Sequence, residues 1–308
     1  MNILIAGASG FIGIELVKAL QAKHAVTVLG RDLATLKKKF TSDINKITWE
    51  SLSQQNAERF NVVVNLCGYN IAQSRWSEAV KKKIIDSRVE TNKKLINWLI
   101  SQQLKPHYIC ANAVGIYGLQ DKNSAASFDE NTPIDFEHPK DFLSEVGIAW
   151  EQSLAPAINY GMPVTITRFG VVLKKDEGML KKLEPAFRFG LGSVLGDGKQ
   201  IISWVHIDDV IASILFLINQ PNLTGAFNVT SPNPIEQGAF AHALARALKR
   251  PLLLKTPAFV IKTLFGEMGE CLLLEGQRVI PTRIQEAGYT FKYLTLADAL
   301  NKEYPLKN

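Results

Sequence analysis

The apolar positions of this chain form short continuous runs that alternate with longer segments of helical spacing. The runs predict strands, and they lie at 2–6, 25–29, 47–50, 62–67 and 107–114. Helical spacing occurs at 11–22 and at 33–40. A longer third segment also has helical spacing, and it places on one face of the helix the residues Ile85, Val89, Asn92, Ile96 and Leu99. Strands that alternate with helices are typical of a parallel sheet covered by helices. The sequence therefore predicts an α/β fold with a doubly wound parallel sheet.

The pattern changes after Leu173. A strand at 163–173 returns to the sheet, and 187–200 (FRFGLGSVLGDGKQ) indicates loops with short strands. A helix at 206–218 and a strand at 225–230 follow, and short helices and loops dominate from Pro232 onward. We therefore predict a core at 1–232 with an insertion at about 175–205, and a smaller, mostly helical lobe at 233–308.

The first predicted strand is followed at once by GASGFIG, with glycines at 7, 10 and 13. Between a strand and a helix, this spacing is typical of a Rossmann-like dinucleotide site: the loop lets the backbone approach a pyrophosphate, and the helix N-terminus attracts its charge. The alternative is a helix-packing loop without a ligand. We predict that 1–232 is an NAD(P)-binding core. The predicted cofactor-binding residues are Gly7, Ser9, Gly10, Phe11, Ile12, Arg31, Leu66, Cys67, Gly68, Ala111 and Val171.

The end of the second strand favours NADP(H) over NAD(H). Arg31 is the first polar residue after Gly30, and an arginine there accepts the 2′-phosphate that an acidic residue would repel. Asp32 is next, and its carboxylate suits either the ribose of NAD or the N-cap of the following helix. We favour the cap.

Several motifs resemble a known family. GASGFIG, NLCG at 65–68 and GIYG at 115–118 are similar to those of extended short-chain dehydrogenases/reductases, the NAD-dependent epimerase/dehydratase family. NIAQSRW, RFGVVL and GQRVIPTRIQEAGYTF resemble a bacterial subgroup of epimerase-family proteins with a C-terminal extension from about residue 250. The resemblance implies a lobe at 233–308 that binds substrate.

The catalytic pair that this resemblance implies is missing. Members use a tyrosine as acid/base and a lysine one helical turn later that lowers its pKa. In HPKDFLSEVGIAWEQ these positions fall on Phe142 and Val146, and the usual serine or threonine falls on Asn112 or Ala113. We therefore predict that this helix serves for packing rather than for chemistry.

Other polar residues near the strand ends are candidates for the site. Tyr117 and Asn112 are the candidate catalytic residues, and for Tyr117 a packed aromatic is an equally good interpretation. The candidate substrate-binding residues are Tyr69, Arg75, Arg88, Arg168 and Lys199. For the arginines, helix capping or salt bridges are the alternatives. For His206 in WVHIDD we favour a structural role. The sequence contains no cluster of metal-ligand residues that would predict a metal site.

The composition limits the kinds of partner and the compartment that we expect. Lysine and arginine exceed the acidic residues by six, and the excess is spread out, so we predict no nucleic-acid partner and favour an anionic small-molecule ligand. The longest apolar run is too short for a membrane span. Three cysteines without metal or pairing motifs indicate a reducing compartment, and a strand that begins at residue 2 leaves no room for a signal peptide. The prediction is a cytoplasmic protein, and a homodimer stays open.

Two functions fit the sequence. The first is an NADP(H)-dependent oxidoreductase or epimerase-like enzyme that acts on a small substrate without the tyrosine–lysine pair. The second is a regulatory or sensor protein that binds NADP(H) without turnover.

Overall fold

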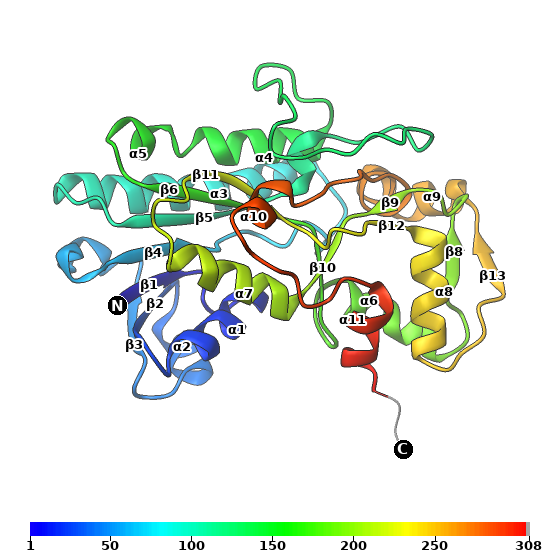
Figure 1. Ribbon diagram of the computed structural model, residues 1–308, viewed down its shortest axis with the longest axis horizontal. Coiled ribbons are helices and arrows are strands. Elements are labelled where there is room, and N and C mark those ends of the chain that lie inside the picture. The colour runs from blue at the N-terminus through cyan, green and yellow to red at the C-terminus, as the bar shows by residue number, and fades with distance from the viewer. Residues whose placement is uncertain (306–308) are drawn as a thin grey trace.

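A seven-stranded parallel sheet forms the centre of the protein (Figure 1). The computed structural model describes residues 1–305. The strand order is β11-β6-β5-β4-β1-β2-β3, and every neighbouring pair is parallel. The strands are β1 (Asn2–Ala6), β2 (Ala25–Gly30), β3 (Asn45–Thr48), β4 (Val62–Asn65), β5 (His107–Ala113), β6 (Val164–Phe169) and β11 (Gly225–Val229). The order reverses between β1 and β4, where doubly wound folds bind ligands. The predicted Rossmann-like fold is confirmed.

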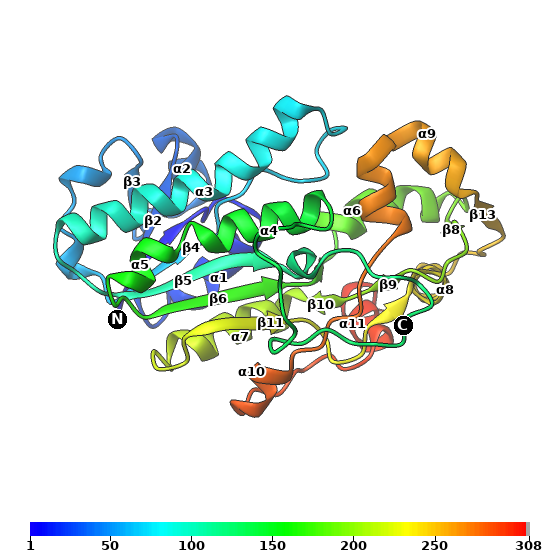
Figure 2. The same ribbon diagram turned by 90° about the horizontal axis from the view of Figure 1, so that it is seen from above.

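Helices cover both faces of this sheet (Figures 1 and 2). One layer contains α1 (Phe11–Leu20), α2 (Leu33–Lys39) and α7 (Ile207–Ile218), and the other contains α3 (Glu78–Ser101), α4 (Phe142–Gln152) and α5 (Ala155–Asn159). Because the sheet is covered on both sides, central strands such as β1 (NILIA) and β4 (VVVN) are nearly continuous apolar runs rather than alternating ones. Short 3₁₀ turns lie between β3 and β4, at η1 (Leu52–Gln54) and η2 (Ala57–Arg59), and after β5, at η3 (Val114–Tyr117).

The long helix α3 is rotated slightly from its predicted orientation. Asn92, Ile96 and Leu99 are buried as predicted. The buried residue near the start of the helix is Ile84 rather than Ile85, because Ile84 packs with two apolar side chains of α4.

A second, smaller lobe lies beside the carboxyl ends of the strands, at the right of Figure 1. It combines the insertion after β6 with the C-terminal region. Its elements are β7 (Val171–Leu173), α6 (Gly178–Arg188), β8 (Ser193–Leu195), β9 (Ile201–Ile202), β10 (Trp204–His206), β12 (Ile235–Glu236), α8 (Gln237–Ala247), β13 (Leu254–Thr256), α9 (Ala258–Gly269), η4 (Glu270–Leu274) and α11 (Leu296–Glu303), whereas α10 (Thr282–Glu286) lies against the main sheet. The strands pair as β10-β7, β12-β9 and β13-β8. Thus segments from both sides of residue 232 build one lobe, and the division of the chain at that residue stays a prediction.

The lobe has its own apolar core, in which Leu180 and Phe187 of α6 pack with Trp204, Phe240 and Leu300. After η4 the chain returns to the sheet, where α10 packs against β11. It then re-enters the lobe, where α11 packs against α8. Among residues 1–305, no helix combines the length and apolarity needed to cross a membrane.

Candidate functional site

The glycine loop between β1 and α1 leaves an unsatisfied helix end at the sheet's switch point. Gly7 has a φ of +77°, and a Cβ there would lie 2.7 Å from the carbonyl carbon of Leu66. A Cβ at Gly13 would lie 2.5 Å from the oxygen of Gly7. The first bond within α1 joins the Ile14 amide to the Gly10 oxygen, so the three preceding amides have no helical acceptor. They form a site that suits a phosphate group.

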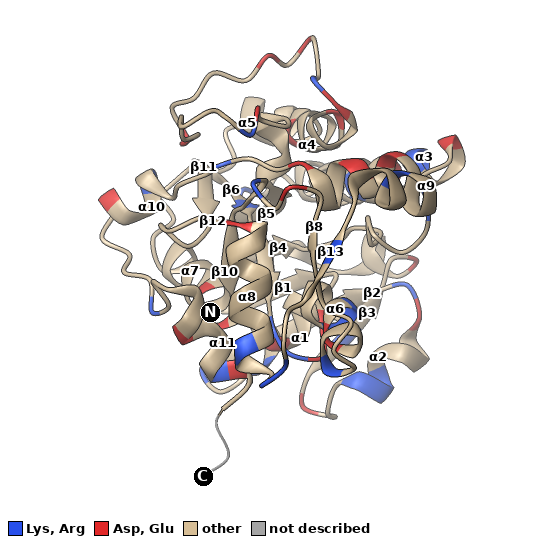
Figure 3. Cartoon of the chain, turned by 90° about the vertical axis from the view of Figure 1, so that its right-hand side faces the viewer, with Lys and Arg blue, Asp and Glu red and all other residues tan. Residues whose placement is uncertain are grey.

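The end of β2 is positively charged. Arg31 is exposed, whereas Asp32 is committed to the N-cap of α2, because its carboxylate accepts hydrogen bonds from the amides of Ala34 (3.2 Å) and Thr35 (2.8 Å). These bonds, led by those from Thr35, lower the pKa of Asp32. The preference for a capping Asp32 is confirmed. Lysines colour the end of α2 blue in Figure 3, and the Lys39 amine lies 2.6 Å from the Ser9 carbonyl oxygen.

Arg88 lies directly behind the segment that follows β4. A Cβ at Gly68 would lie 3.2 Å from the guanidinium carbon of Arg88. Its Nη1 donates to the carbonyl oxygens of Ile84 (2.7 Å) and Tyr69 (3.2 Å), and its guanidinium lies 4.8 Å from the ring centroid of Trp150. Burial lowers the pKa of Arg88 to about 10. Arg88 therefore fastens this segment to α3 by neutral acceptors rather than by the salt bridge we considered.

Tyr117 and Asn112 lie in a buried hydrogen-bond network. The Tyr117 hydroxyl donates to Asn228 Oδ1 (3.0 Å) and accepts from Arg168 (2.8 Å), and its ring stacks on Phe128. Burial raises the pKa of Tyr117. The Asn112 amide donates to the Gly147 oxygen and to Glu151. The side chain of Tyr117 is 3% exposed, so its contacts fit the packed aromatic rather than an acid that faces a ligand.

The helix α4 is a packing element, as predicted. Phe142 and Val146 are buried against Ile84. The Phe142 ring meets the Trp76 ring edge-on, with the centroids 4.7 Å apart. Neither side chain can transfer a proton or perturb a pKa.

His206 has the structural role that we favoured. One ring nitrogen accepts the Asp208 amide and the other lies 2.8 Å from Glu303, while the Asp209 carboxylate accepts the amides of Lys292 and Tyr293. These contacts hold α7 against the C-terminal segment. Within residues 1–305, no three His, Cys, Asp or Glu side chains are grouped so that they could hold a metal ion.

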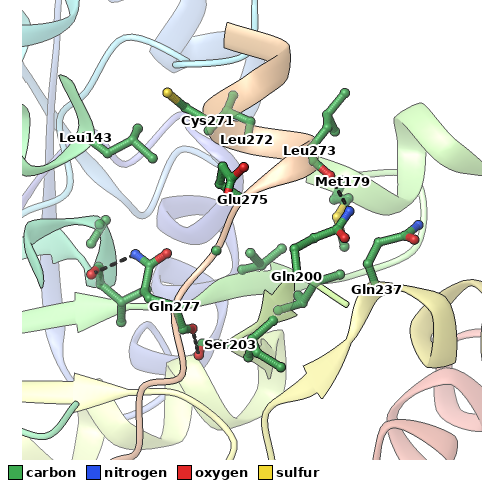
Figure 4. A pocket seen from close by; sticks show the side chains of 18 of the residues that line it. Leu143, Met179, Gln200, Ser203, Gln237, Cys271, Leu272, Leu273, Glu275 and Gln277 are labelled. Atoms are coloured by element: carbon green, nitrogen blue, oxygen red, sulfur yellow. Dashed lines mark hydrogen bonds between the residues drawn. The ribbon is translucent and has the colours of Figure 1, made fainter. Parts of the chain in front are cut away.

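A cavity of about 260 Å³ lies where the lobe faces the ends of β5 and β6 (Figure 4). Ala113, Gly170 and Val171 form its wall on the sheet side, and most of its remaining wall is apolar. The polar side chains that line it are Gln200, Ser203, Gln237, Glu275 and Gln277, and they come from the insertion, α8 and the segment after η4. Ligands of doubly wound sheets bind at such strand ends, so this cavity is the candidate substrate site.

The predicted substrate-binding residues do not line this cavity. Arg75 donates to the Thr263 oxygen of α9 (3.3 Å), Arg168 is paired with Glu151, and Lys199 is exposed on a turn. Tyr69 packs near the start of α3, with the Lys83 amine over its ring. The role of these residues in substrate binding stays a prediction.

Sequence reasoning missed the glutamines and Glu275. The signal was weak: a polar pair in an apolar stretch, LLLEGQRV, and single glutamines after a glycine-rich loop and before a helix. Their convergence depends on how the two parts of the lobe fold over the strand ends, which periodicity does not encode.

The parallel sheet, the glycine loop at its switch point and the cavity beside it define the class of Rossmann-like nucleotide-binding proteins. A sequence profile described as the NAD dependent epimerase/dehydratase family matches residues 3–230, and one described as a domain of unknown function (DUF1731) matches 256–303. The chain belongs to the NAD dependent epimerase/dehydratase family.

Relatives extend the similarity over the whole chain. The Arabidopsis thaliana protein named epimerase family protein SDR39U1 homolog, chloroplastic, is 37% identical over 307 residues, 97% of this chain and 86% of the relative. A Staphylococcus epidermidis epimerase family protein is 33% identical over 304 residues, 97% of each chain.

Solved structures agree with the fold. The crystal structure of human epimerase family protein SDR39U1 (isoform2) with NADPH matches at a TM-score of 0.85 and 29% identity, over 99% of both chains. UDP-glucuronic acid 4-epimerase from Bacillus cereus, in complex with UDP-glucuronic acid and NAD, matches at 0.78 and 18% identity, over 99% of this chain and 98% of that one. The second match supports the fold alone.

Proposed function

We propose that this chain is an NADP(H)-dependent oxidoreductase or epimerase-like enzyme that acts on a small molecule held in the cavity. The main support for the proposal is that the proposed cofactor site and the cavity lie side by side along the carboxyl ends of the strands. The charged end of β2, the free amides of α1 and the wall of the cavity at β5 and β6 follow one another there. The NADPH in the structure of the human relative supports the choice of cofactor.

The residues along this edge fit the cofactor. The amides at the start of α1, with Gly7, Ser9, Gly10, Phe11 and Ile12, would hold the pyrophosphate. Arg31, with Lys39 nearby, would hold the 2′-phosphate. Leu66, Cys67, Gly68 and Ala111 follow at the ends of β4 and β5, and Val171, which lines the cavity, would lie beside the nicotinamide end. When bound, the cofactor would supply or accept hydride.

The proposed reaction also requires a group at the cavity that exchanges a proton with the substrate. Tyr117 and Asn112 are enclosed in their network, and burial raises the pKa of Cys271 to about 12. Glu275 is the carboxyl group that lines the cavity, 3.4 Å from the Lys122 amine. We infer that Glu275 takes the role of acid/base that the family gives to tyrosine.

The second candidate function is an NADP(H) sensor without turnover. The observation that favours it is the burial of Phe142 and Val146, the two apolar side chains on which the sequence resemblance places the family's catalytic tyrosine and lysine.

Two measurements separate these functions: NADPH affinity by fluorescence titration, and NADPH oxidation against a panel of neutral and anionic carbonyl compounds. We expect binding and turnover in the unmutated protein, a rate loss of about 10²-fold or more in Glu275→Gln, and an unchanged rate in Tyr117→Phe. Tight NADPH binding without turnover on any compound would leave the sensor as the function. Absence of NADPH binding would refute both.

A further inference from the structure

The amide groups of the cavity are oriented by their backbone partners. Gln200 Nε2 donates to the carbonyl oxygens of Leu195 (3.2 Å) and Leu273 (2.7 Å). Because both partners are acceptors, the nitrogen must face them, and Gln200 Oε1 is then a buried acceptor without a partner in residues 1–305.

Gln237 has the opposite arrangement. Its Oε1 accepts the Leu195 amide (3.0 Å), so its Nε2 faces away from that partner and makes no hydrogen bond within the described chain. Gln277 donates through Nε2 to the Val114 oxygen (3.0 Å), which leaves its Oε1 as a further acceptor. Three segments thus bring the unbonded amide nitrogen of Gln237 and the amide oxygens of Gln200 and Gln277 to the same cavity (Figure 4).

The charges at the cavity are unfavourable for an anion. No lysine or arginine is among the residues that line it, and the one charged group on its wall is the Glu275 carboxylate. Most of the other lining residues are apolar, among them Leu143, Ile202 and Phe240. A carboxylate or phosphate placed here would lose its hydration without gaining a cation, and it would be repelled by Glu275.

We propose that the cavity selects an uncharged, mainly apolar molecule that carries one hydrogen-bond acceptor for Gln237 and one donor for Gln200 or Gln277. Primary amides and hydroxy ketones on an apolar frame belong to this class, and nucleotide sugars and carboxylates do not. The volume of the cavity, about 260 Å³, lies just below the range of about 300–1,000 Å³ typical of ligand pockets, so it suits a small molecule. The proposal rests on the proposed function in one respect, namely that this cavity is the substrate site.

The test compares two probes of nearly equal shape, cyclohexanecarboxamide and cyclohexanecarboxylate, with UDP-glucuronic acid as the nucleotide sugar. Binding to the NADPH-saturated protein is measured by ligand-observed NMR. We expect the amide to bind at least about tenfold more tightly than the carboxylate, a difference of about 1.4 kcal/mol, and UDP-glucuronic acid not to compete with it.

A matched variant identifies the site. Gln237→Glu keeps the oxygen that accepts the Leu195 amide but replaces the free donor with a second acceptor, so amide binding should fall about tenfold or more while NADPH affinity stays unchanged. Gln54→Glu, at an exposed position of η1, is the control and should change neither.

Three outcomes would overturn the proposal: equal or tighter binding of the carboxylate, no amide binding at millimolar concentration, or amide binding unaffected by Gln237→Glu. Each leaves the proposed function standing if NADPH still binds, whereas loss of NADPH binding in the unmutated protein refutes that function instead.

Discussion

Arg168 and Glu151 form a buried ion pair joined by two hydrogen bonds. Arg168 Nε lies 2.8 Å from Glu151 Oε1, and Nη2 lies 2.9 Å from Oε2. Burial alone would lower the pKa of Arg168, but the bonds and charge of Glu151 outweigh it and raise that pKa. The remaining nitrogen of the guanidinium donates to Tyr117. The pair therefore connects β6, α4 and η3. Three of the five N–H groups of Arg168 are bonded within this network, and Arg168 is not among the residues that line the cavity.

Removal of one partner should be costly. Arg168→Met leaves the Glu151 carboxylate buried without a cation, so the free energy of unfolding should fall by about 3–5 kcal/mol in urea denaturation. Arg250→Met, at an exposed position, is the control and should change it by less than about 0.5 kcal/mol. If Arg168→Met keeps the stability of the control but loses substrate binding, the substrate role predicted from sequence is the correct one.

The cofactor preference should depend on Arg31. Its side chain is exposed at the end of β2, free to contact a 2′-phosphate, while Asp32 is occupied by the cap. Arg31→Ala should remove about 1.5–3 kcal/mol of the preference for NADPH over NADH, because a charge-assisted contact is lost. Fluorescence titrations with both cofactors measure it, with Lys37→Ala as the control on α2. Equal affinities in the unmutated protein would contradict the prediction.

The fold was predictable because its signals are local. Central strands such as β1 (NILIA) and β4 (VVVN) are nearly continuous apolar runs, and the glycines of the first loop are required by contacts under 3 Å at Gly7 and Gly13. The same locality identified Asp32 as a cap, since its partner amides are two and three residues further along the chain.

The substrate site was less predictable because its signals are not local. Arg168 lies at the carboxyl end of a strand, as a ligand-binding residue would, yet its partner is 17 residues earlier in the chain, on a helix. Gln200, Gln237 and Gln277 meet only because the insertion and the C-terminal region fold into one lobe. Sequence spacing carries neither relationship, so neither the Arg168–Glu151 pair nor the lining of this cavity could be predicted from the sequence.

Stability should fall in acid because of His107. Thr165 donates its hydroxyl to the Leu223 oxygen, so His107 Nε2 must donate to Thr165 (2.8 Å), and Nδ1 is buried without a partner. Burial lowers the pKa of His107 from 6.5 to about 4.

Between these two pH values the unfolded chain binds a proton that the folded protein does not. Stability from His107 is therefore complete above pH 6.5 and is lost as the pH falls toward 4, by about 3 kcal/mol at most. Urea denaturation from pH 7 to 4 measures it. His107→Gln, which keeps a donor for Thr165, should flatten this part of the profile, whereas His242→Gln at an exposed position should not. A profile unaltered by His107→Gln would refute the assignment.

Phe142 should contribute to stability and not to chemistry. Its ring is 6% exposed and packs on Trp76 and Ile84, so Phe142→Ala should lower the free energy of unfolding by about 3–5 kcal/mol. Phe142→Tyr should not create ordinary reductase activity, because Val146 stands where the lysine would be, and a phenol without that ammonium keeps a pKa too high for proton exchange near neutrality. The measurements are urea denaturation and NADPH oxidation across the carbonyl panel, with Phe265→Ala on the partly exposed side of α9 as the stability control. A gain of turnover in Phe142→Tyr alone would show that this helix still faces the reacting atoms.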